Sequence, residues 1–238
     1  MRFSAATSAL LVAAIAAAAI HEHALAHDAA ETGTGSLRGS ITVHERSFFG
    51  GLREREDRSG VVVYVTGFAR SAPSRVATLA QKNKRFDPKI LPIVRGQTIQ
   101  FPNNDPIYHN VFSVSAIHEF DLGQYRSGDP PRSELFDKPG LVPVYCNIHP
   151  DMISYVVVLE NDAFAVTAAD GSFVIPNVRA GRLTLNAWMP GAQRTSEDVE
   201  VHAGEETRAA LDLVQSEKIA PHKRKDGSDY PKPRSDDY

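Results

Sequence analysis

Short apolar runs separated by polar turn residues are the dominant pattern along this chain. The runs are of strand length, most are rich in Val, Ile, Tyr or Phe, and Gly, Pro, Asn or Asp lie between them. This pattern is typical of β-strands joined by turns rather than of helices. We therefore predict an all-β fold, with strands near residues 37–43, 61–65, 90–94, 98–101, 111–114, 142–145 and 155–159.

A further strand-rich region follows residue 160. Asp170-Gly171 lies between apolar runs at 164–167 and 173–175, and an Asp-Gly pair, which tolerates left-handed backbone angles, is a strong hairpin signal. Residues 176–181 predict another turn, and 183–188 alternate as a half-buried strand does. We expect strands at 199–201 and 209–214 to complete this region.

Both ends of the chain predict segments outside the folded core. Arg2, the apolar stretch 9–20 and the small residues at 24–26 have the features of an export signal, and the stretch is shorter than the ~20 residues that span a bilayer. We expect 1–26 to be a signal peptide that directs the chain to the periplasm, and the mature protein to have no membrane span. Residues 216–238 are polar and charged with almost no large apolar side chains, which predicts a disordered tail.

The composition excludes some classes of function. The chain is 42% hydrophobic and 23% charged, as expected for a soluble globular protein, and its formal net charge is −3. Basic residues are scattered among acidic ones, so no broad basic face is available to neutralise a phosphate backbone. We therefore expect no nucleic-acid partner.

The segment 144–152 carries the clearest chemical signal. It contains the only cysteine of the chain, Cys146, followed by His149 and Met152, so thiolate, imidazole and thioether donors follow one another at Cys-x2-His-x2-Met spacing. A loop that leaves a strand can turn all three toward one centre. His109, where a turn-rich stretch gives way to a predicted strand, is the candidate for a fourth donor.

Two histidines, one cysteine and a weakly held methionine form the donor set of an electron-transfer copper site, and a thioether is not among the usual zinc ligands. The alternative is that Cys146 and His109 serve packing, as most single cysteines and histidines of a β protein do. Their combination with a nearby His and Met in an exported chain favours a metal. We predict one mononuclear copper ion held by His109, Cys146, His149 and Met152.

Residues 81–160 resemble the cupredoxins. The loop 146–152 is similar to that of amicyanin, and the segments 101–105 and 109–112 are similar to those of plastocyanins and pseudoazurins. The resemblance implies a Greek-key β-sandwich with a type 1 (blue) copper ion beneath the loops at one end. It also implies that the side chain of Asn110 ties the two ligand loops together.

A second resemblance concerns the flanking region. Residues 168–188 resemble the carboxypeptidase-regulatory, transthyretin-like β-sandwich, in which strands like those at 35–43 and 61–65 come first. Those strands occur here before the cupredoxin-like segment. We therefore hypothesise one small β-sandwich, 36–70 and 161–215, interrupted by a cupredoxin domain at 81–160.

Together these features predict an exported blue copper protein that carries single electrons between redox protein partners. We expect the ring edge of His149 to reach solvent inside an apolar rim of Pro150 and Met152, where electrons would enter and leave. A periplasmic copper-binding or copper-delivery protein with the same ligands is the alternative, and a surface-binding module with a vestigial copper site is a third hypothesis. We expect no enzyme activity, because four protein donors leave no open position for a substrate.

Overall fold

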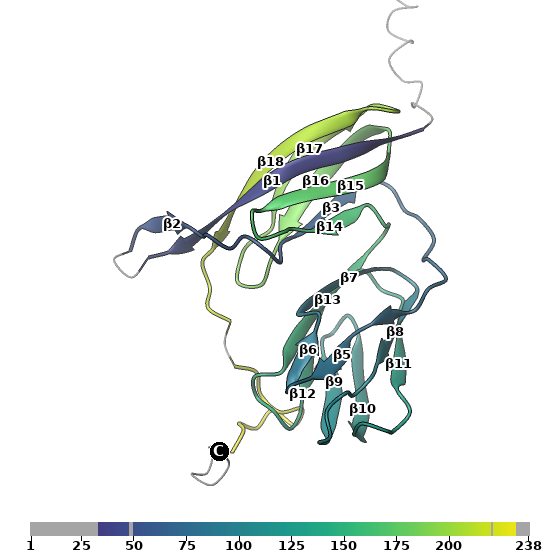
Figure 1. The fold of residues 1–238 in the computed structure, drawn as a ribbon, viewed down its shortest axis with the longest axis vertical. Coiled ribbons are helices and arrows are strands. Elements are labelled where there is room, and N and C mark those ends of the chain that lie inside the picture. The colour runs from purple at the N-terminus through teal and green to yellow at the C-terminus, as the bar shows by residue number, and fades with distance from the viewer. Residues whose placement is uncertain (1–32, 48–49, 220, 232–238) are drawn as a thin grey trace, which may run out of the picture.

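The computed structural model describes residues 33–47, 50–219 and 221–231, so the predicted signal peptide 1–26 lies outside the described residues. The described residues form 18 strands and no helix, which confirms the all-β prediction (Figure 1). Within these ranges the chain accordingly has no helix with the length and hydrophobicity that crossing a membrane requires.

The long predicted apolar runs coincide with strands to within one residue, and the strands that the pattern did not predict are short or polar. In chain order the strands are β1 (Thr34–Arg46), β2 (Leu52–Glu54), β3 (Val62–Thr66), β4 (Ala77–Thr78), β5 (Ala80–Lys82), β6 (Arg85–Asp87), β7 (Ile90–Val94), β8 (Gln97–Phe101), β9 (His109–Val114), β10 (Glu119–Tyr125), β11 (Arg132–Phe136), β12 (Gly140–Cys146), β13 (Ile153–Leu159), β14 (Phe164–Val166), β15 (Ser172–Arg179), β16 (Gly181–Trp188), β17 (Thr195–Val201) and β18 (Glu206–Gln215).

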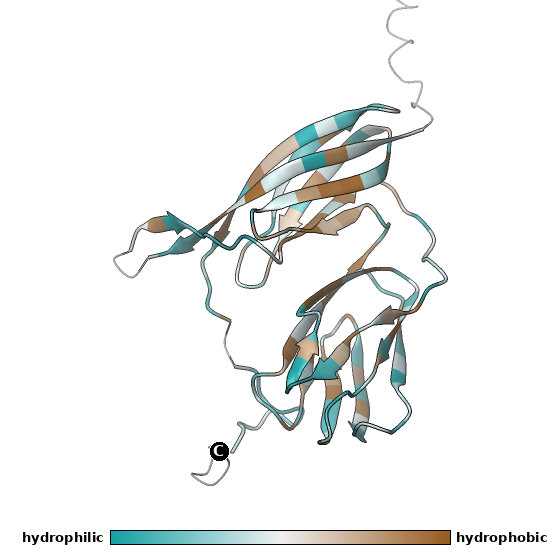
Figure 2. Ribbon diagram, viewed as in Figure 1, coloured by the Kyte–Doolittle hydropathy of each residue, from teal (hydrophilic) through white to brown (hydrophobic). Residues whose placement is uncertain are grey.

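Two four-stranded sheets form the first sandwich. One has the order β15-β1-β18, with β2 paired to the end of β1, and the other has the order β14-β3-β16-β17. Leu37, Ile41 and Val43 of β1 are buried between the sheets and alternate with exposed or half-buried residues, as a strand with one solvent face requires. Figure 2 shows this alternation of hydrophobic and hydrophilic positions along β1.

The first strand of the chain lies in the interior of its sheet. β1 is antiparallel to β15 on one side and parallel to β18 on the other. The contact with β18 is close, because a Cβ atom at Gly39 would lie 1.8 Å from the carbonyl oxygen of Ala209, so only glycine fits there. The first sandwich therefore combines strands that precede and strands that follow the second sandwich in sequence. The domain bounds 36–70, 81–160 and 161–215 stay a prediction.

The second sandwich contains a five-stranded sheet of order β10-β9-β12-β13-β7 and a three-stranded sheet of order β11-β8-β4, with the hairpin β5-β6 beside them. Its core includes Phe101 of β8, Val111 of β9 and Val144 of β12, all fully buried. Cys146 and Met152 belong to the same buried cluster. This core therefore extends to the segment that carries the predicted ligands.

A smaller apolar cluster joins the two sandwiches. Val157 and Leu159 of β13 pack against residues of β3 in the first sandwich. Their neighbours Val156 and Val158 point the other way, into the core of the second sandwich, because side chains alternate along a strand. β13 is therefore covered on both faces, which explains its unbroken run of apolar residues.

Two turns differ from the prediction. Gly171 has the expected left-handed backbone, with a φ of 79°, but β14 pairs with β3 while β15 pairs with β1. The Asp170-Gly171 turn therefore connects the two sheets and does not close a hairpin. The segment 176–181 is mostly a continuation of β15, and Asn177, with a φ of 55°, takes up the irregularity. In both places the pairing with β1 decides the local structure.

Residues 221–231 differ from the predicted disordered tail. They lie against the second sandwich, where the Tyr230 hydroxyl is hydrogen-bonded to the carbonyl of Cys146 and the His222 ring stacks on that of Tyr145 (Figure 1). Two ring side chains therefore help to dock this polar segment, which composition does not reveal. Residues 232–238 of the predicted tail lie outside the described residues.

Candidate metal centre

Three of the predicted ligands meet at one end of the second sandwich. His109 is the first residue of β9, Cys146 is the last residue of β12, and His149 lies in the loop between β12 and β13. β9 and β12 are neighbours in the sheet, with Cys146 opposite Val111. This pairing brings together two side chains that are 37 positions apart in sequence.

The donor atoms of these residues form a small triangle. His109 Nδ1 lies 3.0 Å from His149 Nδ1, and Cys146 Sγ lies 3.8 Å and 3.7 Å from the same two nitrogens. Metal bonds of about 2.0 Å to imidazole and about 2.3 Å to thiolate allow one ion to join two nitrogens up to about 4 Å apart, or a nitrogen and a sulfur up to about 4.3 Å apart. All three edges are shorter than these limits, so the residues fit a single ion.

The thiol of Cys146 is held in its deprotonated form. Burial raises its pKa, but hydrogen bonds from two imidazoles and two backbone N–H groups outweigh burial and lower the pKa to about 5. The donors are the rings of His109 and His149 and the N–H groups of Asn110 and Ile148. A thiolate is the form of cysteine that binds metals, so the fold prepares Cys146 for this role.

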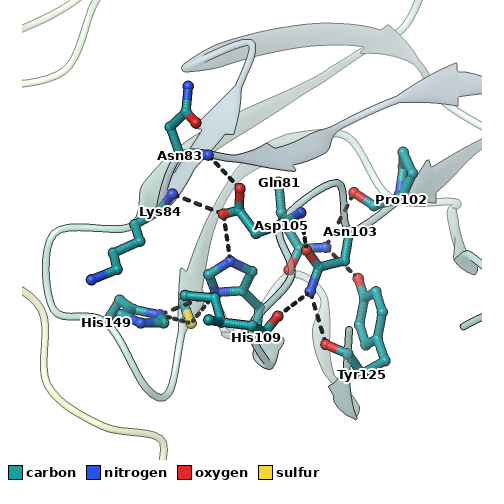
Figure 3. Close-up of polar contacts among 11 residues, drawn as sticks. Gln81, Asn83, Lys84, Pro102, Asn103, Asp105, His109, Tyr125 and His149 are labelled. Atoms are coloured by element: carbon teal, nitrogen blue, oxygen red, sulfur yellow. Dashed lines mark hydrogen bonds and ion pairs between the residues drawn. The ribbon is translucent and has the colours of Figure 1, made fainter. Parts of the chain in front are cut away.

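Asp105 orients His109 from the side opposite the triangle. Its Oδ2 accepts a hydrogen bond from His109 Nε2 at 2.8 Å, and Asp105 is 6% exposed (Figure 3). The backbone N–H groups of Asn83 and Lys84, at the turn of the hairpin β5-β6, donate to the same carboxylate at 2.6 Å and 2.9 Å. Histidines that bind a metal commonly donate their second ring N–H to a carboxylate in this way.

These hydrogen bonds set the charges around the histidine. Burial raises the pKa of Asp105, but the hydrogen bonds from Lys84, His109 and Asn83 lower it by more, so the carboxylate is charged. Burial lowers the pKa of His109, but the contacts with Cys146 and Asp105 raise it by more. Asp105 was not among the predicted site residues, although its position four residues before His109 in a turn-rich segment is a usable signal.

Main-chain hydrogen bonds fix the loop that carries the ligands. The N–H of Cys146 donates to the Met152 carbonyl at 3.2 Å, and the N–H of Met152 donates to the His149 carbonyl at 3.2 Å. The N–H of Asn147 donates to the carbonyl of Asn110 at 3.1 Å, which ties this loop to β9. The loop is therefore closed on itself and attached to the strand that begins at His109.

The side chain of Asn110 does not make the predicted tie. It donates to Asp121 Oδ1 at 2.6 Å and to the carbonyl of Gly123 at 3.0 Å, both on β10. The two ligand segments are joined by the backbone of Asn110 instead, through its carbonyl and through its N–H to Cys146. The amide side chain thus anchors β9 to the edge strand, which is a different task from the one predicted.

Met152 lies at the end of the ligand loop and is fully buried in the cluster that contains Cys146. Its role as a fourth ligand stays a prediction. Because Met152 has no exposed surface, the prediction that it forms part of an apolar rim around His149 is wrong. Pro150 is exposed and Ile148 is 37% exposed, so these two provide the apolar surface next to the half-buried His149.

Comparison with known proteins gives one match by family. The family model described as polysaccharide lyase family 4, domain II, matches residues 153–209, which begin in β13 and end in β18. This match covers well under half of the chain and leaves out the candidate metal centre. The chain has no match among curated protein sequences.

The solved structures that resemble part of the chain include cupredoxins and a copper enzyme. A purple cupredoxin from Nitrosopumilus maritimus is 24% identical with a TM-score of 0.32, over 35% of this chain and 99% of its own. A copper-containing nitrite reductase from Thermus scotoductus is 26% identical with a TM-score of 0.35, over 41% of this chain and 25% of its own. The reduced Cu(I) form of an amicyanin mutant is 20% identical with a TM-score of 0.33, over 41% of this chain and 98% of its own. Likeness at these TM-scores does not establish a family.

Proposed function

We propose that this chain is an exported copper protein that carries single electrons between redox proteins. The proposal depends on one observation, the convergence of Cys146 Sγ and the Nδ1 atoms of His109 and His149 within 3.8 Å of one another. With the thioether of Met152 as the predicted axial donor, this is the donor set of an electron-transfer copper centre. Bound copper would supply a centre that gains and loses one electron.

The surroundings of the ligands support electron transfer. Asp105 holds the ring of His109 from outside the triangle, and main-chain hydrogen bonds hold the loop that contains Cys146 and His149. Ligands fixed in this way move little when the charge of the site changes, which favours rapid transfer. Four protein donors would leave no open coordination position, so we propose a carrier and not an enzyme.

The surface beside His149 supports brief encounters with partners. His149 is half-buried, and its neighbours Ile148 and Pro150 are exposed. A small apolar patch suits electron-transfer complexes, whose interfaces are small and short-lived. We propose that electrons enter and leave at the ring edge of His149, in the periplasm to which the predicted signal peptide directs the chain.

Copper reconstitution of the mature chain tests this proposal. We expect an intense visible absorption from thiolate-to-copper charge transfer and a reversible one-electron reduction. Cys146→Ser should abolish the visible band, whereas His44→Asn, on β1 of the first sandwich, should leave it unchanged. A colourless copper-loaded wild type would overturn the proposal. Slow electron self-exchange together with transfer of Cu(I) to an acceptor would favour copper delivery.

A further inference from the structure

The segment 221–231, which we call the C-terminal strap, contacts the ligand loop at two places. The hydroxyl of Tyr230 donates to the backbone carbonyl of Cys146 at 2.5 Å. The backbone N–H of Lys225 donates to Asn147 Oδ1 at 2.9 Å. The strap is therefore bonded to the ligand cysteine itself and to the residue that follows it.

A third contact reaches the ligand cysteine indirectly. Lys225 Nζ donates to Asp121 Oδ2 at 2.5 Å, and the other oxygen of Asp121 accepts the side-chain amide of Asn110 at 2.6 Å. The N–H of Asn110 in turn is hydrogen-bonded to the sulfur of Cys146. Lys225 thus belongs to a continuous chain of polar contacts that ends at the thiolate.

Ring packing and a tight turn give the strap a defined conformation. The ring of His222 stacks on Tyr145 with centroids 4.4 Å apart and also meets the ring of Tyr230 edge-on at 5.3 Å. Between them, Gly227 with a φ of 81° closes a turn in which its N–H donates to the carbonyl of Arg224. This turn brings both Lys225 and Tyr230 into contact with the ligand loop of the second sandwich.

We propose that the C-terminal strap braces the metal centre from outside and that Tyr230 and Lys225 are its positioning residues. A hydrogen bond to the Cys146 carbonyl fixes the peptide that follows the thiolate ligand, and the bond to Asn147 fixes the next residue. Both bonds restrict the backbone that leads to His149. The inference rests on the proposed function only in that the ion held at this centre is copper.

Two conservative substitutions in the full mature chain test the strap. Tyr230→Phe removes the hydroxyl and keeps the ring contact with His222. Lys225→Met removes the positive charge and keeps a side chain of similar length. Lys218→Met, at an exposed position before the strap, is the matched control, and Lys225→Arg should rescue the contact with Asp121. Far-ultraviolet circular dichroism checks that every variant retains its strands.

Amide hydrogen exchange of the metal-free protein gives the first readout. We expect the amides of 146–152 to exchange about threefold to tenfold faster in Tyr230→Phe and in Lys225→Met, the range set by the loss of one hydrogen bond. A chain that ends at Ser216 should exchange faster still in this loop. Lys218→Met and Lys225→Arg should match the wild type.

The copper-loaded protein gives the second readout. We expect Tyr230→Phe and Lys225→Met to change the ratio of the thiolate-to-copper absorption bands and the copper hyperfine splitting, because the thiolate is less firmly oriented. Unchanged exchange and unchanged spectra in both variants would overturn the strap inference even when the wild type is blue. A colourless wild type would overturn the proposed function alone, and hydrogen exchange would still decide the role of the strap.

Discussion

Asp105 and His109 form a buried pair in which the carboxylate accepts the Nε2–H of the ring at 2.8 Å. This hydrogen bond holds a ring proton on Nε2, so that Nδ1, the atom that faces Cys146 and His149, is the ring nitrogen that would bind a metal. The carboxylate is itself fixed by two backbone N–H groups of the hairpin β5-β6. A turn more than twenty residues upstream therefore sets the direction of a ligand ring.

Removing the charge of Asp105 should weaken the binding of Cu(II). We expect Asp105→Asn to lower Cu(II) affinity by about 10- to 100-fold, as loss of a carboxylate partner of a metal-bound histidine does. A negative charge favours the oxidised ion, so the reduction potential should rise, by about 59 mV for each factor of ten in differential affinity. Competition titration and potentiometry measure both effects. Asp87→Asn, an exposed acid on β6, is the control, and equal values for the two variants would contradict this role of Asp105.

Met152→Leu should distinguish a packing role of Met152 from a role as a metal ligand. The substitution conserves volume in the buried cluster, so the free energy of unfolding of the metal-free protein should fall by less than about 1.5 kcal/mol. Loss of an axial thioether should raise the reduction potential and alter the visible spectrum of the copper-loaded protein, because the axial ligand tunes such sites. An unaltered spectrum and potential would show that Met152 serves packing alone.

Asn110→Ala should destabilise the metal-free protein by about 1–3 kcal/mol, because two hydrogen bonds are lost. Asn110 is 1% exposed, and its side-chain amide donates to the exposed carboxylate of Asp121 and to the carbonyl of half-buried Gly123. Urea unfolding measures the change. Asn104→Ala, at an exposed position of the preceding loop, is the control and should cost less than about 0.5 kcal/mol. Equal midpoints for the two variants would contradict the anchoring role.

Stability of the metal-free protein should rise with pH from about 5 to about 6.5. The pKa of Cys146 is about 5 when folded and about 8.5 in a free cysteine, so in this window the unfolded chain binds a proton that the folded chain does not. The rise from this group is about 1.4 kcal/mol per pH unit. Above about 6.5 the raised pKa of His109 gives the opposite slope, because the folded state then keeps a proton that the unfolded chain has lost, and the curve should flatten.

Urea unfolding at several pH values checks this dependence against Cys146→Ser. The variant has no thiol to titrate, so the rise from this group should disappear between pH of about 5 and about 6.5. Parallel curves for the two proteins would mean that the thiol is not deprotonated in the folded state.

Hydrophobic runs predicted the covered strands well and the exposed edge strands poorly. β12 and β13 contain the predicted runs because they lie inside the five-stranded sheet, and β7, although it lies at an edge of that sheet, has the predicted bounds because all of its residues are buried or half-buried. β10 and β11 were missed, since they lie at sheet edges and most of their residues are exposed or half-buried, so they contain no continuous apolar run.

Site residues that are marked by their local sequence were predicted, whereas those that depend on contacts between distant segments were missed. Cys146 and His149 are visible in the sequence because they share one loop, and His109 is visible because it begins a strand. Asp105 depends on a hairpin that meets it only in the folded chain, and Tyr230 on a segment 84 residues beyond Cys146. Such contacts have no sequence period, so pattern analysis could not predict them.

The interior position of β1 has a consequence for the order of assembly. Gly39 lies opposite Phe173 on one side and Ala209 on the other, so this part of β1 has no partner until β15 has been synthesised and lacks its second partner until β18 follows. Strands β4 to β13 all lie between Ala77 and Leu159 and need no such distant partner. Because pairing between distant residues is slow, the strands of the inserted unit can pair while the first sandwich still lacks β15 and β18, and only the C-terminal strap is added to the inserted unit later. The middle of the sequence would thus fold before the segments on either side of it.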